Sequence, residues 1–270
     1  MKFLTFIEID LRKVIPLLVG MFILATLAFQ GLFAKLVIMA NDELIRNATQ
    51  TGVTVAELVK SANPLSLTTI IDSNPYPLLA LLFVGMGLIL FGFYVWYKEW
   101  FGASKRIYTL LSIKGSRFRI FTSKLIVFLF IFLAYYAVIL LNLFISTVVM
   151  KLILPEQAIS DHLVANFMLH SQFLPYVLPV SVRALLFNLA FIMMMFAILS
   201  VFVLSDRSQR IWGMLFGFVY MISTIVIFFY VNTLELYTSE RLMANWAFTG
   251  IVLIISTLIS YYLLKKKVSI

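Results

Sequence analysis

Residues 125–148 read LIVFLFIFLAYYAVILLNLFISTV, an apolar run without a charged side chain. A helix needs about 20 such residues to cross the hydrocarbon core of a bilayer, so this run is long enough to span a membrane. The whole chain is 63% hydrophobic and only 12% charged, whereas roughly a quarter of the residues in a soluble domain are charged. The run therefore predicts an integral membrane protein.

Five further apolar runs of similar length accompany this one. They predict membrane spans at residues 14–34, 76–97, 179–204, 211–231 and 245–264. The first run is long and lacks a small-x-small cleavage site, so we interpret it as a retained helix and not as a signal peptide. No repeat or polar linker divides the chain, so we expect one domain, residues 1–270. The sequence thus predicts an all-α, polytopic membrane protein with six transmembrane helices.

The distribution of positive charge predicts which side each loop faces. With the N-terminus inside, 15 of the 21 Lys and Arg residues lie on the cytoplasmic side. These are Lys2, Arg12, Lys13, Lys98, Lys105, Arg106, Lys114, Arg117, Arg119, Lys124, Arg207, Arg210, Lys265, Lys266 and Lys267. Both termini are therefore expected in the cytoplasm, and the net charge of +9 serves topology and does not indicate a nucleic-acid partner.

Two short helices are expected outside the spans. Residues 1–13 place Phe3, Phe6, Ile7 and Leu11 opposite Glu8 and Arg12, which predicts an amphipathic N-terminal interfacial helix, a frayed terminus being the alternative. In the longest outer loop, residues 40–75, helical spacing of Val55, Leu58, Val59 and Ala62 predicts a second one.

Motifs for catalysis are missing from the sequence. There is no cysteine, and both histidines, His162 and His170, fall in the second outer loop, 149–178, too far from bilayer depth for a membrane protease. With Glu156 and Asp161 they lack the spacing of a zinc motif, and no phosphate-binding loop is present. We expect no enzyme, no metal and no cofactor in this chain; if ATP drives the protein, another chain must hydrolyse it.

A few polar and small residues within the spans are candidates for function. Arg183, Asn188 and Asn142 are possible substrate-path residues; Arg183 could instead extend to the interface, and the two amides could instead join helices by hydrogen bonds. Gly213 and Gly217 form a G-x-x-x-G motif, which predicts close helix packing or a dimer interface.

The cytoplasmic segment 97–124 differs from every other loop. Its apolar residues Trp100, Ala103, Ile107, Leu110 and Leu111 share one helical stripe, which predicts an amphipathic helix continuing from the second span. Gly115 and Ser116 suit a helix end and a new helix start, so a second helix should begin near Arg117. The alternative is that the basic residues only enforce topology and contact anionic lipid. Neither the enforcement of topology nor contact with anionic lipid requires the break at Gly115 and Ser116.

The run EWFGASKRIYTLLSIKGSRFRIFTSKL, residues 99–125, resembles the first cytoplasmic loop of the type-2 ATP-binding-cassette (ABC) exporter permeases. The residues that match are Glu99, Thr109, Leu110, Leu111, Ser112, Ile113, Ser116, Arg117 and Lys124. Lys114 and Gly115 stand where that family usually has proline and its neighbour. The six-span plan fits over the full chain, whereas the specific motif covers only this loop.

The resemblance implies a coupling helix between spans 2 and 3 that docks on a separate ATPase. The implied docking residues are Glu99, Arg106, Thr109, Leu110, Leu111, Ile113, Lys114, Gly115 and Arg117. It also implies two ABC ATPase subunits that hold ATP and Mg, and a second permease copy or a paralogue. Many members carry re-entrant helices between spans 5 and 6, whereas this chain has only residues 232–244 there, so its outer gate is reduced or partly formed by the second outer loop.

The expected role is that of an exporter permease in the cytoplasmic membrane of a bacterium. The largely uncharged spans favour amphipathic or hydrophobic cargo, with antimicrobial or cytolytic peptides first and lipids or lipophilic drugs second. Membrane lipid is an expected partner, and nucleic acid is not. A sensor or resistance component that passes strain to a cytoplasmic ATPase without moving cargo is the alternative, and a channel is a third possibility.

Overall fold

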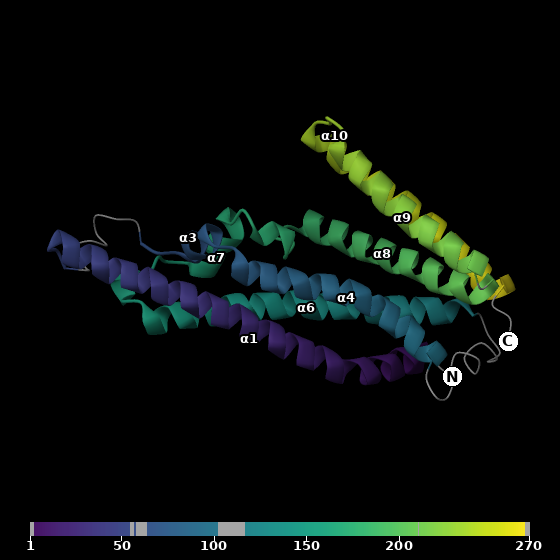
Figure 1. Cartoon of the computed structure of the whole chain (residues 1–270), viewed down its shortest axis with the longest axis horizontal. Coiled ribbons are helices and arrows are strands. Elements are labelled where there is room, and N and C mark those ends of the chain that lie inside the picture. Colours follow the sequence, from purple (N-terminus) through teal and green to yellow (C-terminus); the bar gives the residue numbers. More distant parts are fainter. Residues whose placement is uncertain (1–2, 55–56, 58–63, 102–116, 210, 268–270) are drawn as a thin grey trace. The chain divides into compact units, whose positions relative to one another are not determined.

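The structure is a computed structural model that describes residues 3–54, 57, 64–101, 117–209 and 211–267. Six helices are long and apolar enough to cross a membrane: α1 (Phe3–Thr51), α4 (Tyr76–Phe101), α6 (Phe118–Ile153), α8 (Val182–Gln209), α9 (Ile211–Thr233) and α10 (Thr238–Tyr262). They are shown in Figure 1. The described residues form no strand, and the only extended pairing among them is an isolated bridge between Leu65 and Ile159. This confirms the all-α fold and the six spans of a multi-pass membrane protein; the sidedness stays a prediction.

The first helix is longer than the sequence predicts. α1 has 49 residues, which corresponds to about 70 Å, whereas the hydrocarbon core is about 30 Å thick. Part of α1 therefore extends beyond the bilayer. Residues 3–13, predicted as a separate interfacial helix, are its first turns, and the helix continues through Pro16 without a break. The second predicted short helix, Val55 to Ala62, lies outside the described residues.

The other boundaries agree with the prediction to within a few residues, except at α6 and α10. α6 starts at Phe118 and has 36 residues, so it too is longer than a bilayer crossing needs. α10 begins at Thr238, so only residues 234–237 connect it to α9. These connecting residues leave no room for a re-entrant helix, as the sequence indicates.

The chain divides into two compact units, each described by itself. Unit 1 comprises Met1–Pro16, Gly87–Phe132 and Arg183–Ile270, and unit 2 comprises Leu17–Met86 and Leu133–Val182. α1, α4 and α6 each contribute residues to both units, so neither unit is a contiguous segment of sequence. That residues 1–270 form one domain stays a prediction.

In unit 2, the segments that precede α4 and follow α6 pack on each other. The Leu65 amide donates to the Ala158 carbonyl (2.8 Å), and the Ser160 amide donates to the Leu65 carbonyl (2.9 Å). α3 (Leu67–Ser73) contacts α7 (Leu163–His170), as Figure 1 shows, and the carboxylate of Asp72 accepts hydrogen bonds from Ser171 Oγ (2.8 Å) and the Gln172 amide (3.0 Å). The described segments 64–75 and 154–178 of the two predicted outer loops therefore pack together, and we call them the cap. The short helices η1 (Glu156–Ala158) and η2 (Leu174–Tyr176) complete it.

In unit 1, aromatic side chains fill the space between α4, α6 and α8. Phe196 of α8 lies 5.6 Å from Phe121 and 5.2 Å from Phe128 of α6, measured between ring centroids, and it stacks on Trp96 of α4. All four side chains are buried. α9 and α10 form a hairpin, in which the amides of Asn232 and Asn245 exchange two hydrogen bonds. The core of unit 1 thus lies beside the ends of α4 and α6 from which the loop at 102–116 begins and ends.

Candidate functional site

The predicted docking loop is described only at its two ends. Glu99 lies in the last turn of α4, but its side chain is outside the described residues. The segment 102–116 also lies outside them, and with it the predicted docking residues Arg106, Thr109, Leu110, Leu111, Ile113, Lys114 and Gly115. The structure describes the two flanks of this segment, which are α4 up to Phe101 and the chain from Arg117 onward.

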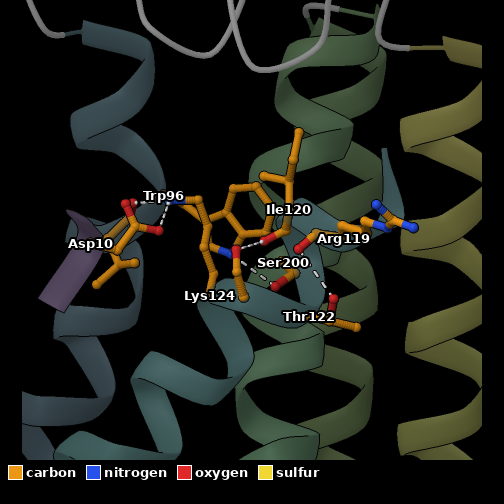
Figure 2. A network of polar contacts seen from close by, with 9 residues as sticks. Asp10, Trp96, Arg119, Ile120, Thr122, Lys124 and Ser200 are labelled. Atoms are coloured by element: carbon orange, nitrogen blue, oxygen red, sulfur yellow. Dashed lines mark hydrogen bonds and ion pairs between the residues drawn. The ribbon is translucent and has the colours of Figure 1, made fainter. Parts of the chain in front are cut away.

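At these flanks, Lys124 of α6 is a buried cation. Its side chain is 1% exposed. Its ammonium donates a hydrogen bond to the Val95 carbonyl of α4 (3.0 Å) and lies 3.7 Å from Asp10 Oδ2 of α1. The same nitrogen lies 5.4 Å from the centre of the Trp96 ring, within the range of a cation–π interaction. Figure 2 shows Lys124 between Asp10 and Trp96, so one ammonium group joins three helices.

Trp96 extends this connection to a fourth helix. Its indole Nε1 donates to Ser200 Oγ of α8 (2.9 Å), and the Ser200 hydroxyl donates to the Phe196 carbonyl (2.8 Å). Neither Trp96 nor Ser200 is exposed. A buried indole needs such an acceptor because an unpaired N–H is costly away from water. We call Asp10, Val95, Trp96, Lys124 and Ser200 the basal network (Figure 2).

Pairing explains why a lysine is tolerated here. An unpaired charge in a span costs several kcal/mol or shifts its protonation, whereas a charge with a counter-ion and a hydrogen-bonded carbonyl is retained. Asp10 is 11% exposed at its side chain, so it keeps some contact with the surroundings while it faces Lys124. The network therefore fixes α1, α4, α6 and α8 to one another close to where the loop starts and ends.

Further polar contacts lie near the same helix ends. The Tyr97 hydroxyl donates to Asp206 Oδ2 of α8 (3.2 Å). Arg117, the one predicted docking residue whose side chain is described, donates from Nη1 to the Leu264 carbonyl (3.3 Å) of η3 (Leu263–Lys267), the short helix that follows α10. The Phe118 ring meets the Tyr261 ring edge-on at 5.7 Å. Residues immediately before and after the loop are thus attached to α8 and to the C-terminal part of the chain.

The contacts of the basal network hold helices in position. The basal network has a cation, a carboxylate, an indole and a hydroxyl, and the hydroxyl already donates to the Phe196 carbonyl and accepts from the Trp96 indole. What the arrangement can do is pass a displacement of α4 or α6 to the neighbouring helices, because each is held by a directional contact. The expectation that this chain is not itself an enzyme stays a prediction.

The predicted glycine contacts are made within the chain. Gly213 and Gly217 of α9 are buried. A Cβ on Gly217 would lie 2.9 Å from Phe202 Cα of α8 and would also meet Ser205 Oγ, so α8 and α9 approach closely at this position. Helix packing is therefore observed for Gly217, and its partner is α8. A dimer contact through this face stays a prediction.

The three candidate substrate-path residues lie in different surroundings. Asn142 is not exposed: its amide donates to Thr26 Oγ1 (3.1 Å) and accepts from Gln30 Nε2 (3.1 Å), which joins α6 to α1. The structure thus gives it the interhelical hydrogen-bonding role. Arg183 is exposed in the first turn of α8, and Asn188 is half-buried one turn and a half further on. Asn142 belongs to unit 2, whereas Arg183 and Asn188 belong to unit 1.

The histidines of the cap form no metal site with their neighbours. Among the residues that the structure describes, no group of three His, Asp or Glu side chains is arranged to hold an ion. His170 Nδ1 lies 3.1 Å from the Asn166 carbonyl. His162 precedes α7 with a φ of 52°, an unusual conformation for a residue with a side chain. The expectation of no metal site stays a prediction for the whole chain.

Sequence reasoning did not identify the basal network as a unit. At the level of the sequence, Lys124 is one of the cytoplasmic positive charges and a matching residue of the loop motif, and Asp10 and Trp96 are not singled out. A signal was present, because Asp10 and Lys124 have opposite charges and stand at the predicted cytoplasmic ends of two apolar runs. Such residues lie at similar depth, although the sequence does not say which helices are neighbours.

Comparison of the chain with protein-family models, with curated proteins and with solved structures gives no match in any of the three.

Proposed function

We propose that this chain is the membrane-spanning permease subunit of an ATP-driven exporter that works with a separate ABC ATPase. The observation that carries the proposal is the sequence of the loop from Glu99 to Lys124, with its amphipathic stripe, its Gly-Ser break and its resemblance to the docking loop of type-2 exporter permeases. The six spans are compatible with it.

The basal network supports a coupling role for this loop. A loop that transmits force must be firmly attached at both ends, so that a displacement of the loop also displaces the neighbouring helices. The end at α4 carries Trp96, and the end at α6 carries Lys124, and these two side chains reach α8 and α1. A pull on the loop would thus act on four helices together and not on a flexible linker.

In the proposed cycle, two ATPase subunits bind ATP with Mg and close on each other. Their motion moves the docked loops of two permease copies, and the basal network passes that motion into the spans. The spans then open a path to the outside for amphipathic or hydrophobic cargo, with peptides as the first candidates. The proposed location is the cytoplasmic membrane of a bacterium.

Co-purification tests the proposal. The full chain, extracted from its native membrane, should retain an ATP-hydrolysing subunit of the ABC class, and Leu110→Asp should release that subunit. Leu169→Asp is the matched control, because Leu169 is exposed on α7 and belongs to the cap. Retention of the ATPase by Leu110→Asp, or its absence from the unmodified protein, would contradict the assignment.

Transport in proteoliposomes separates the exporter from the sensor. For the purified complex, we expect ATP-dependent movement of an amphipathic peptide across the bilayer and a matching rise in ATP hydrolysis. If peptide stimulates hydrolysis but is not moved, the chain is a sensor and the export proposal is wrong.

A further inference from the structure

A groove of about 570 Å³ lies in unit 2 at the end of α6. One wall is the last turns of α6, through Phe144, Thr147 and Lys151, and the opposite wall is the segment 156–165, which leads into α7. The predicted span within α6 ends at residue 148, so we expect Lys151 and the segment 156–165 in the headgroup layer. The groove is therefore expected at the membrane interface; its residues belong to unit 2, whereas those of the basal network belong to unit 1.

Four ionisable side chains of both signs line the groove. Lys151 stands on α6, and Glu156, Asp161 and His162 stand on the facing segment. All four are exposed. Among the described contacts, none of the four side chains forms an ion pair or a side-chain hydrogen bond with another. A groove with cationic and anionic groups that do not neutralise each other suits a ligand that also carries both charges.

The surface next to the groove suits hydrocarbon. Phe144, Val148 and Leu152 are exposed and lie one helical turn apart along α6, so they form an apolar stripe beside the groove. In a membrane protein such a stripe contacts acyl chains. A molecule with its polar head in the groove and its chains along this stripe would match both surfaces.

Ser160 adds an unsatisfied polar group to the wall. Its Oγ is buried and, in the part of the chain that the structure describes, has no hydrogen-bond partner. This oxygen has almost no accessible surface, so the charged side chains, and not the Ser160 hydroxyl, face a ligand in the groove.

We propose that the groove binds the zwitterionic headgroup of a membrane phospholipid. The phosphate interacts with Lys151 and His162, and the ammonium group interacts with Glu156 and Asp161. Free phosphoethanolamine has the same head chemistry but no chains for the apolar stripe, so the lipid is the expected source. This site does not depend on the proposed export function.

Binding to the delipidated full chain in detergent tests the site, with native mass spectrometry as the readout. Phosphatidylethanolamine should bind more tightly than phosphatidylglycerol, which lacks the ammonium group, and far more tightly than water-soluble phosphoethanolamine. Lys151→Gln and Glu156→Gln should each weaken phosphatidylethanolamine binding about tenfold, as expected for one charge-assisted hydrogen bond. Both side chains are exposed, so the variants should fold normally, which circular dichroism verifies.

Matched controls remove the same charges elsewhere. Lys35→Gln and Asp42→Asn change exposed residues of α1 that do not line the groove, and they should leave binding unchanged. The proposal is overturned if Lys151→Gln and Glu156→Gln bind the lipid as the unmodified chain does. Equal binding of phosphatidylglycerol would overturn the zwitterionic preference, and equal binding of free phosphoethanolamine would overturn the lipid source.

Discussion

Replacing Lys124 by methionine should destabilise the packing of α1, α4 and α6. Methionine keeps most of the length and volume of lysine but has no ammonium group. The change removes the hydrogen bond to the Val95 carbonyl (3.0 Å), the ion pair with Asp10 (3.7 Å) and the contact with the Trp96 ring (5.4 Å). Asp10 then remains without this counter-ion.

The expected loss is about 3 kcal/mol of unfolding free energy. Breaking a buried ion pair by removing one partner typically costs about 3–5 kcal/mol. Asp10 is 11% exposed and can be partly hydrated, which places the effect at the lower end. Lys124→Met also removes the unfavourable cost of burying an ammonium group, and this gain offsets part of the lost unfolding free energy.

Unfolding of the full chain by sodium dodecyl sulfate in mixed micelles, followed by circular dichroism, measures the change. Lys35→Met, on the exposed side of α1, is the matched control and should leave the unfolding midpoint unchanged. Asp10→Asn completes a double-mutant cycle, in which we expect a coupling of about 2 kcal/mol between Asp10 and Lys124.

Two results would refute this reasoning. One is a Lys124→Met variant that unfolds at the same detergent fraction as the unmodified chain. The other is additivity of Asp10→Asn and Lys124→Met, because independent effects would mean that the two side chains do not stabilise each other. In either case the basal network would not fix the helix ends, and the coupling role would lose its structural support.

The remaining predictions use the same unfolding measurement. Gly217→Ala should cost about 1–3 kcal/mol because its Cβ meets the backbone of α8. Gly250→Ala should be harmless, because its Cβ would meet no heavy atom within 4 Å apart from the local backbone of its own helix; equal effects would contradict the close packing. Trp96→Phe keeps a buried ring but loses the hydrogen bond to Ser200, so we expect a loss of about 1 kcal/mol, and no loss would mean that this bond does not stabilise the network. Asn142→Leu should cost about 1–3 kcal/mol because it removes the side-chain hydrogen bonds to Thr26 and Gln30 of α1, although Gln30 keeps its bond to the backbone carbonyl of residue 142; an unchanged midpoint would show that this bridge is dispensable.

The spans were predictable because the bilayer imposes a length and a polarity on each of them. The run 125–148 has no charged residue, so its identity as a span needed no knowledge of its neighbours. The true helix lengths were not predictable in the same way. α1 continues to Thr51 although Asp42, Glu43 and Arg46 are polar, because a helix outside the hydrocarbon core no longer needs apolar residues.

The candidate site was only partly predictable for a related reason. Hydropathy locates Lys124 at the start of a span, but it does not reveal that Asp10 and Trp96 lie beside it. Contacts between helices depend on which faces meet, and a single sequence leaves those faces open. Asn142 illustrates the same limit: its polarity indicates either a bridge or a substrate path, and its partners on α1 could not be named from the sequence; the contact with Gln30 shows the bridge, and the substrate path stays a prediction.

The docking loop is the part of the chain on which the proposed function depends most directly. A photo-crosslinking amino acid at position 110, in the full chain and in its native membrane, would probe that loop, with position 169 on α7 as the control. We predict that position 110 forms an adduct with an ABC ATPase and that position 169 does not. The absence of an ATPase adduct at position 110, or an equal adduct at both positions, would contradict the proposal that this chain is the permease of an ATP-driven exporter.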